Sequence, residues 1–450
     1  MNRLCLGLTV TFVALVVAFS GSAVSVADPN VNTDRFFVNP LSLPFTALPG
    51  TSTTRYWGIT DGAGWRIEVP DNWNGDLVLS AHGYAGTGDL LAVQNPSLRA
   101  HLIAMGYAWA ASSYRANGYV PGTGAEDTYN LLKIFQHEVG KDTPGGKKGA
   151  SGKPNRVYLF GVSMGGHVVG HMIERWPNTF DGALPVCGVM GDNELFDFFQ
   201  DMYLVAETLV GHVPIVPTPA DYYTNPAAGW QVTRALLGTP YPTALTPVGE
   251  IFKQIIENLS GGDRPVFDEG WVGPTGGAFA FNFGSAVAAP GRENANTVYQ
   301  FDTDPSLSPE EQLFNDTIIR LSAATQDRNP QGIYSETTSS PYLSGRFRIP
   351  VLTLHTLGEL FVPFHMEQVY ARRVIDVGDP DLLVQRAIRG RAHCEFLPGE
   401  LTTAFNDLVN WVTNGIRPDG DDILDPARVA AADFGCQFTP VTHPLVPPCP

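Results

Sequence analysis

Residues 157–166 read Val-Tyr-Leu-Phe-Gly-Val-Ser-Met-Gly-Gly, and this run decides the fold. Strand-forming residues lead straight into Gly161-x-Ser163-x-Gly165, and a helical stretch follows at 167–175. A strand, a serine with glycines two positions before and after it, and a helix form the nucleophile elbow. The glycines are needed because a Cβ at either place would collide with the neighbouring strand or helix. The run therefore predicts a nucleophilic serine, against the alternative of a glycine-rich turn at a helix start.

Strand and helix patterns alternate on both sides of this run. The strand-like stretches lie at 56–60, 65–69, 77–81, 107–111, 156–160, 182–187, 350–355 and 383–388. The helical stretches lie at 98–105, 126–139, 167–175, 364–376 and 398–413. Such alternation favours right-handed crossovers and a mainly parallel sheet. The sequence therefore predicts the α/β class, with helices flanking the sheet.

The first 27 residues predict a signal peptide. Arg3 gives a positive start, residues 4–19 are almost wholly apolar, and Ser25-Val-Ala27 offers small residues for cleavage. The apolar run is short for a membrane span, and no second run follows it. We therefore expect a secreted protein without a membrane span, whose mature chain begins near Asp28.

The alternation of strands and helices stops after residue 190. Three helical stretches, separated by Pro-, Gly- and Asn-rich connections, lie at 194–209, 247–259 and 309–325. The strand pattern then returns at residue 348. We therefore predict a hydrolase-like core at residues 28–190 and 346–416. A helical lid at residues 191–345 is inserted between two strands of one sheet. A Pro-rich tail without helix or strand period follows at residues 417–450.

The charge balance bears on the partners. The chain has 45 acidic and 28 basic residues, which gives a net charge of -17. Nucleic-acid binding needs a basic surface, so a nucleic-acid partner is not expected. Acidity of this kind is typical of a protein that must stay soluble outside the cell.

The general base is sought among the histidines, because a serine needs one to take its proton. In this class of hydrolase the chain order is serine, acid, histidine. Of the 10 histidines, the insertion is followed by His355, His365, His393 and His443. His355 ends a strand, and His443 lies in the tail. His365 opens a helix too few residues after that strand to reach back to the serine. His393 follows the strand at 383–388 in a turn, so it is the predicted base; the alternative is a loop histidine without a role.

The acid should follow the strand at 350–355. Glu359 is the only carboxylate of the local run 355–363. The rival is Asp192, after the strand at 182–187, where some related hydrolases keep their acid. We favour Glu359 because of its position, since a glutamate and an aspartate accept the imidazole N–H equally well.

An oxyanion hole needs two backbone N–H donors aimed at the developing negative charge. Met164, directly after the nucleophile, is one predicted donor. The other should come from His82-Gly83-Tyr84, which follows the buried strand at 77–81. There the glycine lets the backbone approach, and the Tyr84 N–H donates.

Aromatic and polar residues near the expected sheet edge are predicted to contact the substrate. Phe196 and Phe199 occur at helical spacing at the start of the insertion, although a helical aromatic stripe also suits a buried core. Tyr114 and Arg115 follow the strand at 107–111. Arg115 could meet an acidic substrate, and its alternative role is a structural ion pair.

Four cysteines remain once Cys5 is removed with the signal peptide: Cys187, Cys394, Cys436 and Cys449. An even number in an exported chain favours two disulfides, and four cysteines allow three connectivities. Their spacings contain no CxxC pair and do not resemble a zinc site.

These motifs resemble the α/β-hydrolase superfamily, and the resemblance is carried by Ser163, Glu359, His393 and the pair His82-Gly83. Asn72-Trp-Asn-Gly75, and the cysteine directly after the base, are similar to exported bacterial esterases of the tannase and feruloyl esterase kind. The resemblance implies an α/β-hydrolase fold and a serine hydrolase that needs no cofactor.

The same resemblance implies the disulfides. In that family a second cysteine precedes the serine, and a disulfide ties serine and histidine together. Here Val162 occupies that place, so this chain departs from the pattern, and Cys187 is the available substitute. On this ground we predict the pairs Cys187–Cys394 and Cys436–Cys449. The departure leaves open whether the phenolic esters of that family are substrates here.

Tannase-like members also bind calcium in the lid through clusters of carboxylates. The lid carboxylates of this chain are loosely spaced, for example Asp302, Asp304 and Glu310. No metal site is predicted.

Taken together, the sequence predicts a secreted serine hydrolase that cleaves a small-molecule or polymeric carboxylic ester through an acyl-enzyme on Ser163. Two alternatives stay open. One is a secreted serine peptidase of the exopeptidase type, because amide and ester hydrolysis use the same groups. The other is a hydrolase fold that binds without catalysis.

Overall fold

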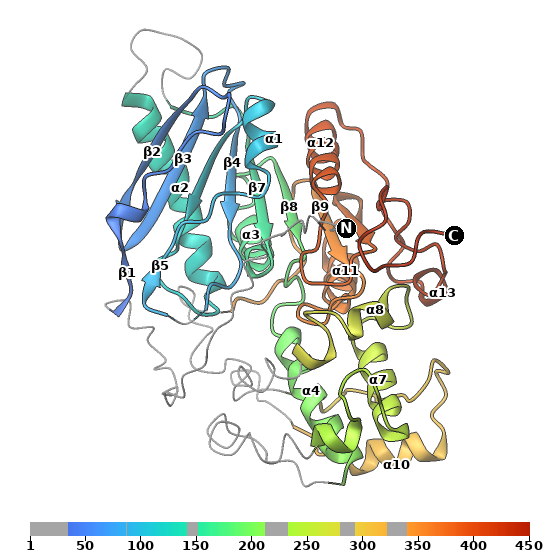
Figure 1. Cartoon of the computed structure of the whole chain (residues 1–450). Coiled ribbons are helices and arrows are strands. Elements are labelled where there is room, and N and C mark those ends of the chain that lie inside the picture. The colour runs from blue at the N-terminus through green and yellow to red at the C-terminus, as the bar shows by residue number, and fades with distance from the viewer. Residues whose placement is uncertain (1–34, 87, 142–151, 212–232, 280–292, 322–339) are drawn as a thin grey trace, which may run out of the picture.

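The computed structural model describes residues 35–86, 88–141, 152–211, 233–279, 293–321 and 340–450 (Figure 1). The expected signal peptide lies outside these residues, so it stays a prediction. Within the described residues, no helix combines the length and the apolar character that crossing a bilayer requires.

The strands of one central sheet are β2 (Thr53–Thr60), β3 (Ala63–Pro70), β4 (Leu77–Ala81), β6 (Ala108–Ser112), β7 (Val157–Val162), β8 (Gly182–Val186), β9 (Val351–Thr356) and β10 (Leu383–Ile388). Their spatial order is β2-β3-β6-β4-β7-β8-β9-β10. β3 runs antiparallel to both of its neighbours, and all other pairings in this sheet are parallel. The prediction of a mainly parallel sheet is confirmed. Beside it, β1 (Phe37–Val38) pairs with β5 (Leu90–Leu91).

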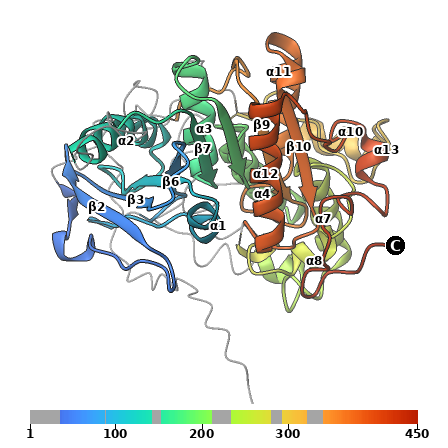
Figure 2. The ribbon, with the colours of Figure 1, turned by 90° about the horizontal axis from the view of Figure 1, so that it is seen from above.

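Helices cover both faces of the sheet. They are α1 (Arg99–Ala104), α2 (Pro121–Lys141), α3 (Met164–Arg175), α11 (His365–Val377) and α12 (Pro398–Asn414), with short 3₁₀ turns at η2 (Pro40–Ser42) and η4 (Pro380–Leu382). Figure 2 shows α2, α3 and α11 on one side and α1 and α12 on the other. Neighbouring residues of β4 divide accordingly: Leu77 and Leu79 pack with the first group, and Val78 packs with the second. Because both faces are buried, the strands are almost continuously apolar.

The chain between β8 and β9 forms a separate helical group. Its described helices are α4 (Glu194–Leu209), α7 (Pro247–Leu259), α8 (Phe267–Trp271) and α10 (Pro309–Thr317), which lie together below the sheet in Figure 1. Their apolar faces form a third cluster, which also includes Leu360, Val362 and Met366 of the β9–α11 region. The insertion therefore packs on the segment that follows β9. The expected helix at 309–325 ends earlier, at Thr317, and residues 322–325 lie outside the described part.

The C-terminal tail is more ordered than the sequence predicts. The expectation that it has no helix is wrong for α13 (Pro426–Val429), where the Asp425 side chain accepts from the Ala427 N–H and a proline takes the first helical position. Val429 and Phe434 are buried against Leu357 and Ala387 of the main domain. The tail is thus packed onto the end of the sheet where β9 and β10 lie.

Candidate active site

The chain has the α/β-hydrolase fold, in which a serine on a sharp strand-to-helix turn stands at the edge of a mainly parallel sheet. Here that serine is Ser163, between β7 and α3, with φ 60° and ψ −124°. Such a backbone conformation is sparsely populated for residues other than glycine and is typical of functional sites. The glycines are sterically required: a Cβ at Gly161 would lie 2.1 Å from the Gly165 carbonyl oxygen, and one at Gly165 would lie 2.1 Å from the Ala81 oxygen.

The structure brings His393 to this serine. The His393 Nε2 lies 2.8 Å from the Ser163 Oγ, and its Nδ1 bonds to the Glu359 Oε2. Since a carboxylate can only accept, Nδ1 carries the hydrogen and Nε2 is free to take the serine proton. Ser163, Glu359 and His393 thus form a hydrogen-bonded chain across loops that follow β7, β9 and β10.

The other carboxylate considered from the sequence lies elsewhere. Asp192 accepts from the Arg373 Nη1 at 2.5 Å and from the Leu343 N–H at 2.9 Å. Burial raises the pKa of Asp192, and the Arg373 charge opposes that shift. Asp192 therefore ties the start of the insertion to α11, while Glu359 is the carboxylate that meets His393.

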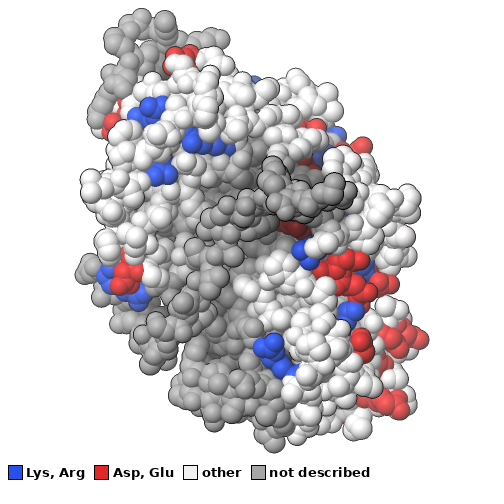
Figure 3. All heavy atoms as spheres, viewed as in Figure 1, with Lys and Arg blue, Asp and Glu red and all other residues white. Residues whose placement is uncertain are grey.

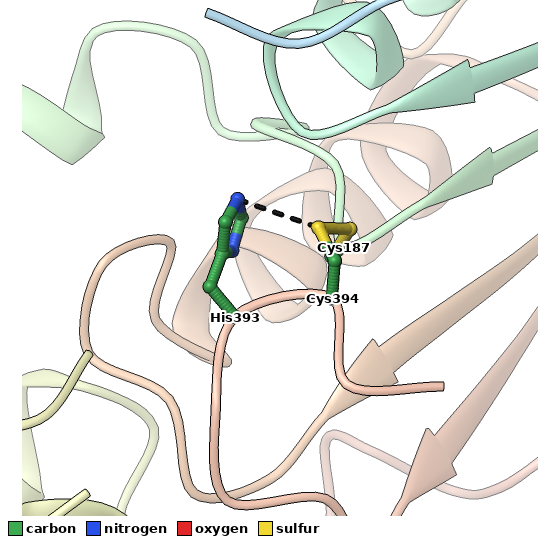
Figure 4. Close-up of side chains that lie close together, drawn as sticks. All are labelled: Cys187, His393 and Cys394. Atoms are coloured by element: carbon green, nitrogen blue, oxygen red, sulfur yellow. Dashed lines mark hydrogen bonds between the residues drawn. A yellow bond between two sulfur atoms is a disulfide. The ribbon is translucent and has the colours of Figure 1, made fainter. Parts of the chain in front are cut away.

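Both predicted disulfides are present, Cys187–Cys394 and Cys436–Cys449. Figure 4 shows the first beside the His393 ring, whose Nε2 lies 3.4 Å from the Cys394 Sγ. Cys187 directly follows β8, so the disulfide fastens the loop of the base to the strand next to β7. These three residues are close enough together to suggest metal ligands, but the two sulfurs are bonded to each other and offer no thiolate.

The residues predicted for the oxyanion hole lie against the serine. A Cβ at Gly83 would lie 3.0 Å from the Ser163 Cβ and 3.2 Å from the Val162 carbonyl oxygen. Any larger residue would press on Ser163 here, so the glycine favours the close approach of the backbone before Tyr84. Met164 is the first residue of α3, where N–H groups have no acceptor within the helix. Both backbones are therefore next to the nucleophile, and their roles as donors stay predictions.

Thr275 of the insertion contacts the two loops that carry Glu359 and His393, which the sequence did not predict. Its Oγ1 accepts from the His393 N–H at 2.8 Å, and its carbonyl accepts from the Leu360 N–H at 3.3 Å. A threonine in a Gly- and Pro-rich run carries no pattern that would single it out. The insertion thus helps to hold the backbone of the base.

Phe361 is a second residue that the sequence reasoning missed, although it stands only two positions after the acid. Its ring meets the His393 ring edge-on at 5.0 Å, and the Phe279 ring meets Phe361 at 5.1 Å. Phe199 of α4 lies behind them, 6.4 Å from Phe361. Aromatic rings therefore form one apolar side of the site, next to the base.

The predicted substrate contacts on α4 divide into two cases. Phe199 is 1% exposed within the core of the insertion, so direct substrate contact by its ring is a wrong prediction. Phe199 belongs to the same apolar cluster as Phe252 and Ile256 of α7, which packs against α4. Phe196 is half-buried and meets the Tyr119 ring at 4.8 Å. Its contact with substrate stays a prediction.

Tyr114 was also assigned wrongly, because its side chain is completely buried. Its ring stacks on His82 at 3.9 Å, and its hydroxyl donates to the His82 carbonyl at 3.0 Å. Tyr114 therefore supports the loop that approaches the serine. Arg115 makes ion pairs with Glu126 at 2.7 Å and Asp127 at 3.1 Å, which is its structural alternative from the sequence.

The charged surface is uneven. On the face shown in Figure 3, Asp and Glu side chains gather over the region of α7, α8 and α10, whereas Lys and Arg are scattered. The described part of this face has no continuous basic track of the kind that a phosphate backbone binds.

Comparisons with known proteins find distant similarities. No protein-family model matches the chain. The chain is 22% identical over 433 residues to an o-phthalyl amidase of Xanthobacter agilis, which covers 84% of this chain and 92% of that protein. It is similar to the crystal structure of feruloyl esterase B from Aspergillus oryzae (TM-score 0.49, 16% identity, 84% of each chain). It is also similar to the tannin acyl hydrolase from Aspergillus niger (TM-score 0.39, 12% identity, 84% of this chain and 86% of that one). The strand order and the elbow identify the fold without these likenesses.

Proposed function

We propose that this chain is a secreted serine hydrolase that cleaves carboxylic esters through an acyl-enzyme on Ser163. The observation that carries the proposal is the hydrogen-bonded chain from the Ser163 Oγ through His393 to the buried Glu359. This is the arrangement that activates a serine for attack on an acyl carbon.

The mechanism follows from the positions of these groups. The His393 Nε2 takes the Ser163 proton while the Oγ attacks the ester carbonyl, and Glu359 stabilises the imidazolium that forms. The Tyr84 and Met164 N–H groups hold the oxyanion. The imidazolium then protonates the leaving alkoxide, and water, activated by the same histidine, releases the acid.

Amides are the second substrate class, because the amidase of Xanthobacter agilis is similar to this chain along most of its length. Amide and ester hydrolysis share nucleophile, base and oxyanion hole, and they differ mainly in the protonation of the leaving group. A peptidase of the exopeptidase type is the form of this alternative that the sequence left open.

The insertion fits the role of a lid over the site. Two contacts support this role: the bond from the His393 N–H to Thr275, and the ring contact of Phe279 with Phe361. We assign apolar parts of a small-molecule or polymeric ester to the aromatic side next to His393. The two disulfides and the N-terminal apolar segment support export as the route to an oxidising compartment.

The test is labelling of the purified protein with a fluorophosphonate probe, followed by a panel of p-nitrophenyl esters and aminoacyl and phthalyl anilides. We expect labelling at Ser163, and faster hydrolysis of esters than of the matching amides. Higher kcat/KM for anilides would make the chain an amidase. Absence of labelling in folded protein would leave a binding protein with a hydrolase fold.

A further inference from the structure

A second buried histidine, His355, lies on the side of Glu359 away from His393. It belongs to β9, and its ring nitrogens face two carboxylates: the Nε2 lies 3.4 Å from the Glu359 Oε1, and the Nδ1 lies 3.3 Å from the Glu367 Oε1. All three side chains are at most 1% exposed. Two carboxylates and two histidines therefore alternate from α11 to the nucleophile.

The hydrogen bonds fix where the protons are. The His355 Nε2 lies 2.7 Å from the Val362 carbonyl oxygen, which can only accept, so this nitrogen carries a hydrogen. The Nδ1 faces the Glu367 Oε1, so a second proton lies between these two atoms. Either the histidine carries this proton as well, or the carboxyl does.

The surroundings of Glu367 decide between these forms. Its Oε2 accepts from the Thr353 hydroxyl and from the Gln385 amide, each at 2.6 Å. Donors of this kind stabilise the ionised carboxylate. This arrangement favours the form in which the His355 ring holds both protons as an imidazolium. Burial alone would lower the pKa of His355, but Glu367 and Glu359 together raise it above its ordinary value.

A positive charge on His355 would offset the negative charges of the two buried carboxylates beside it. Without that charge, two buried carboxylates would face one neutral imidazole, and no cation would offset the cost of burying both charges. With His355 charged, the group of three has a single net negative charge, which is what one triad carboxylate supplies. The same loop also orients the acid, because the Val362 N–H donates to the Glu359 Oε2 at 3.2 Å.

We propose that His355 and Glu367 are positioning residues, a buried ion pair that keeps Glu359 ionised and directed at His393. The inference rests on the proposed function. His365 at the start of α11 is a further titratable neighbour of His355 within the described residues, and Arg264 and Arg372 lie near it. Burial, with the Arg264 and His355 charges, lowers the pKa of His365 to about 3, so it stays neutral.

The experiment measures kcat/KM for a p-nitrophenyl ester against pH in His355→Gln, Glu367→Gln and the double variant. In His355→Gln two carboxylates remain without a cation, so we expect the acid limb to move up by about one pH unit. We also expect kcat to fall by about 10- to 100-fold. Glu367→Gln should not move the limb upward, because the cation beside Glu359 remains. The double variant restores one net negative charge, so its limb should return toward the wild-type position and its kcat should exceed that of His355→Gln.

His443→Gln is the matched control. His443 lies in the tail and is buried, and its Nε2 lies 2.8 Å from a carboxylate oxygen of Glu400 in α12. It should leave the acid limb unchanged. An acid limb that does not move in folded His355→Gln would overturn the inference. A kcat of the double variant that equals the product of the two single losses would do the same. In both cases labelling of the wild-type protein would still uphold the proposed function. A wild-type protein that does not label would overturn both.

Nitrogen-15 NMR of histidine-labelled wild-type protein decides the question if His355→Gln does not fold. We expect both ring nitrogens of His355 to be protonated at pH 7. A neutral ring would overturn the inference.

Discussion

The sheet and the insertion contribute to the candidate site in different ways. Ser163, Glu359 and His393 each follow a strand of one sheet, so the backbone pairing sets their spacing. Thr275 and Phe279 come from the insertion, and they contact the loops of those residues from outside. The sheet therefore fixes the reacting groups, and the insertion adjusts how firmly they are held and what lies beside them.

The largest effect should come from Ser163→Ala, a change within the sheet region. Alanine fits the elbow, so the fold should survive, while kcat should fall by about 10⁴- to 10⁶-fold because the nucleophile is gone. Ester assays and thermal unfolding of the same preparation measure both. More than a few per cent of residual activity would refute the role of the elbow.

The next effect separates the two acids. Glu359→Gln should lower kcat by up to about 10⁴-fold, because an amide does not stabilise the imidazolium. Asp192→Asn removes the ion pair with Arg373 and should lower the melting temperature with a mild effect on kcat. Glu359→Asp should fall between them, since its shorter side chain under-reaches. The reverse ranking of the two amide variants would assign the acid to Asp192.

The Cys187–Cys394 disulfide links the base loop to the sheet. Replacing both cysteines by serine should lower kcat by about 10²-fold through misplacement of His393, before global stability is lost. Cys436→Ser with Cys449→Ser is the control, because that disulfide closes a short loop in the tail. Equal losses of kcat in the two pairs would show that the effect is not local.

Thr275→Val tests the contribution of the insertion. Valine keeps the shape but removes the acceptor of the part-buried His393 N–H, and the loss of one such hydrogen bond costs about 0.5–1.5 kcal/mol. We expect kcat to fall roughly 10-fold with little change in KM. Thr275→Ser should restore it, and failure of that rescue would show that the methyl group, rather than the hydrogen bond, matters.

The last prediction concerns stability rather than rate, at the contact between the sheet region and the insertion. His167 of α3 accepts from the Tyr119 hydroxyl and donates to the Pro341 carbonyl, and burial lowers its pKa from 6.5 to about 4. Because the unfolded chain takes up this proton more readily, stability should fall as the pH drops from about 6.5 to 4, by roughly 1.4 kcal/mol per unit at most. His167→Gln should reduce the slope of this dependence in urea unfolding measured across that range. The lowered pKa values of His171 and His365 should account for slope that remains.

The sequence predicted those features of the fold and the candidate site that depend on local patterns of residues. The elbow glycines, the chain order of serine, acid and histidine, and the apolar strands are local signals, and the structure brings Ser163, Glu359 and His393 together. Tyr114 and Phe199 were assigned wrongly because an apolar residue after a strand or on a helix stripe does not reveal which side is covered. The bond between Thr275 and the His393 N–H joins segments 118 residues apart, and such a contact leaves no local pattern.

The Cys187–Cys394 disulfide also determines when, during synthesis and export, the loop of His393 can be fastened to the sheet. It joins residues 207 positions apart, on either side of the whole insertion, so it can close only after nearly all of the chain has been made. Such bonds form and persist in oxidising compartments, and cytosolic thiols stay reduced. While the chain is inside a reducing cytosol, the loop of His393 lacks its fastening to the sheet. For the exported hydrolase proposed above, activity would therefore be delayed until export, and the esters of the producing cell would be protected from it.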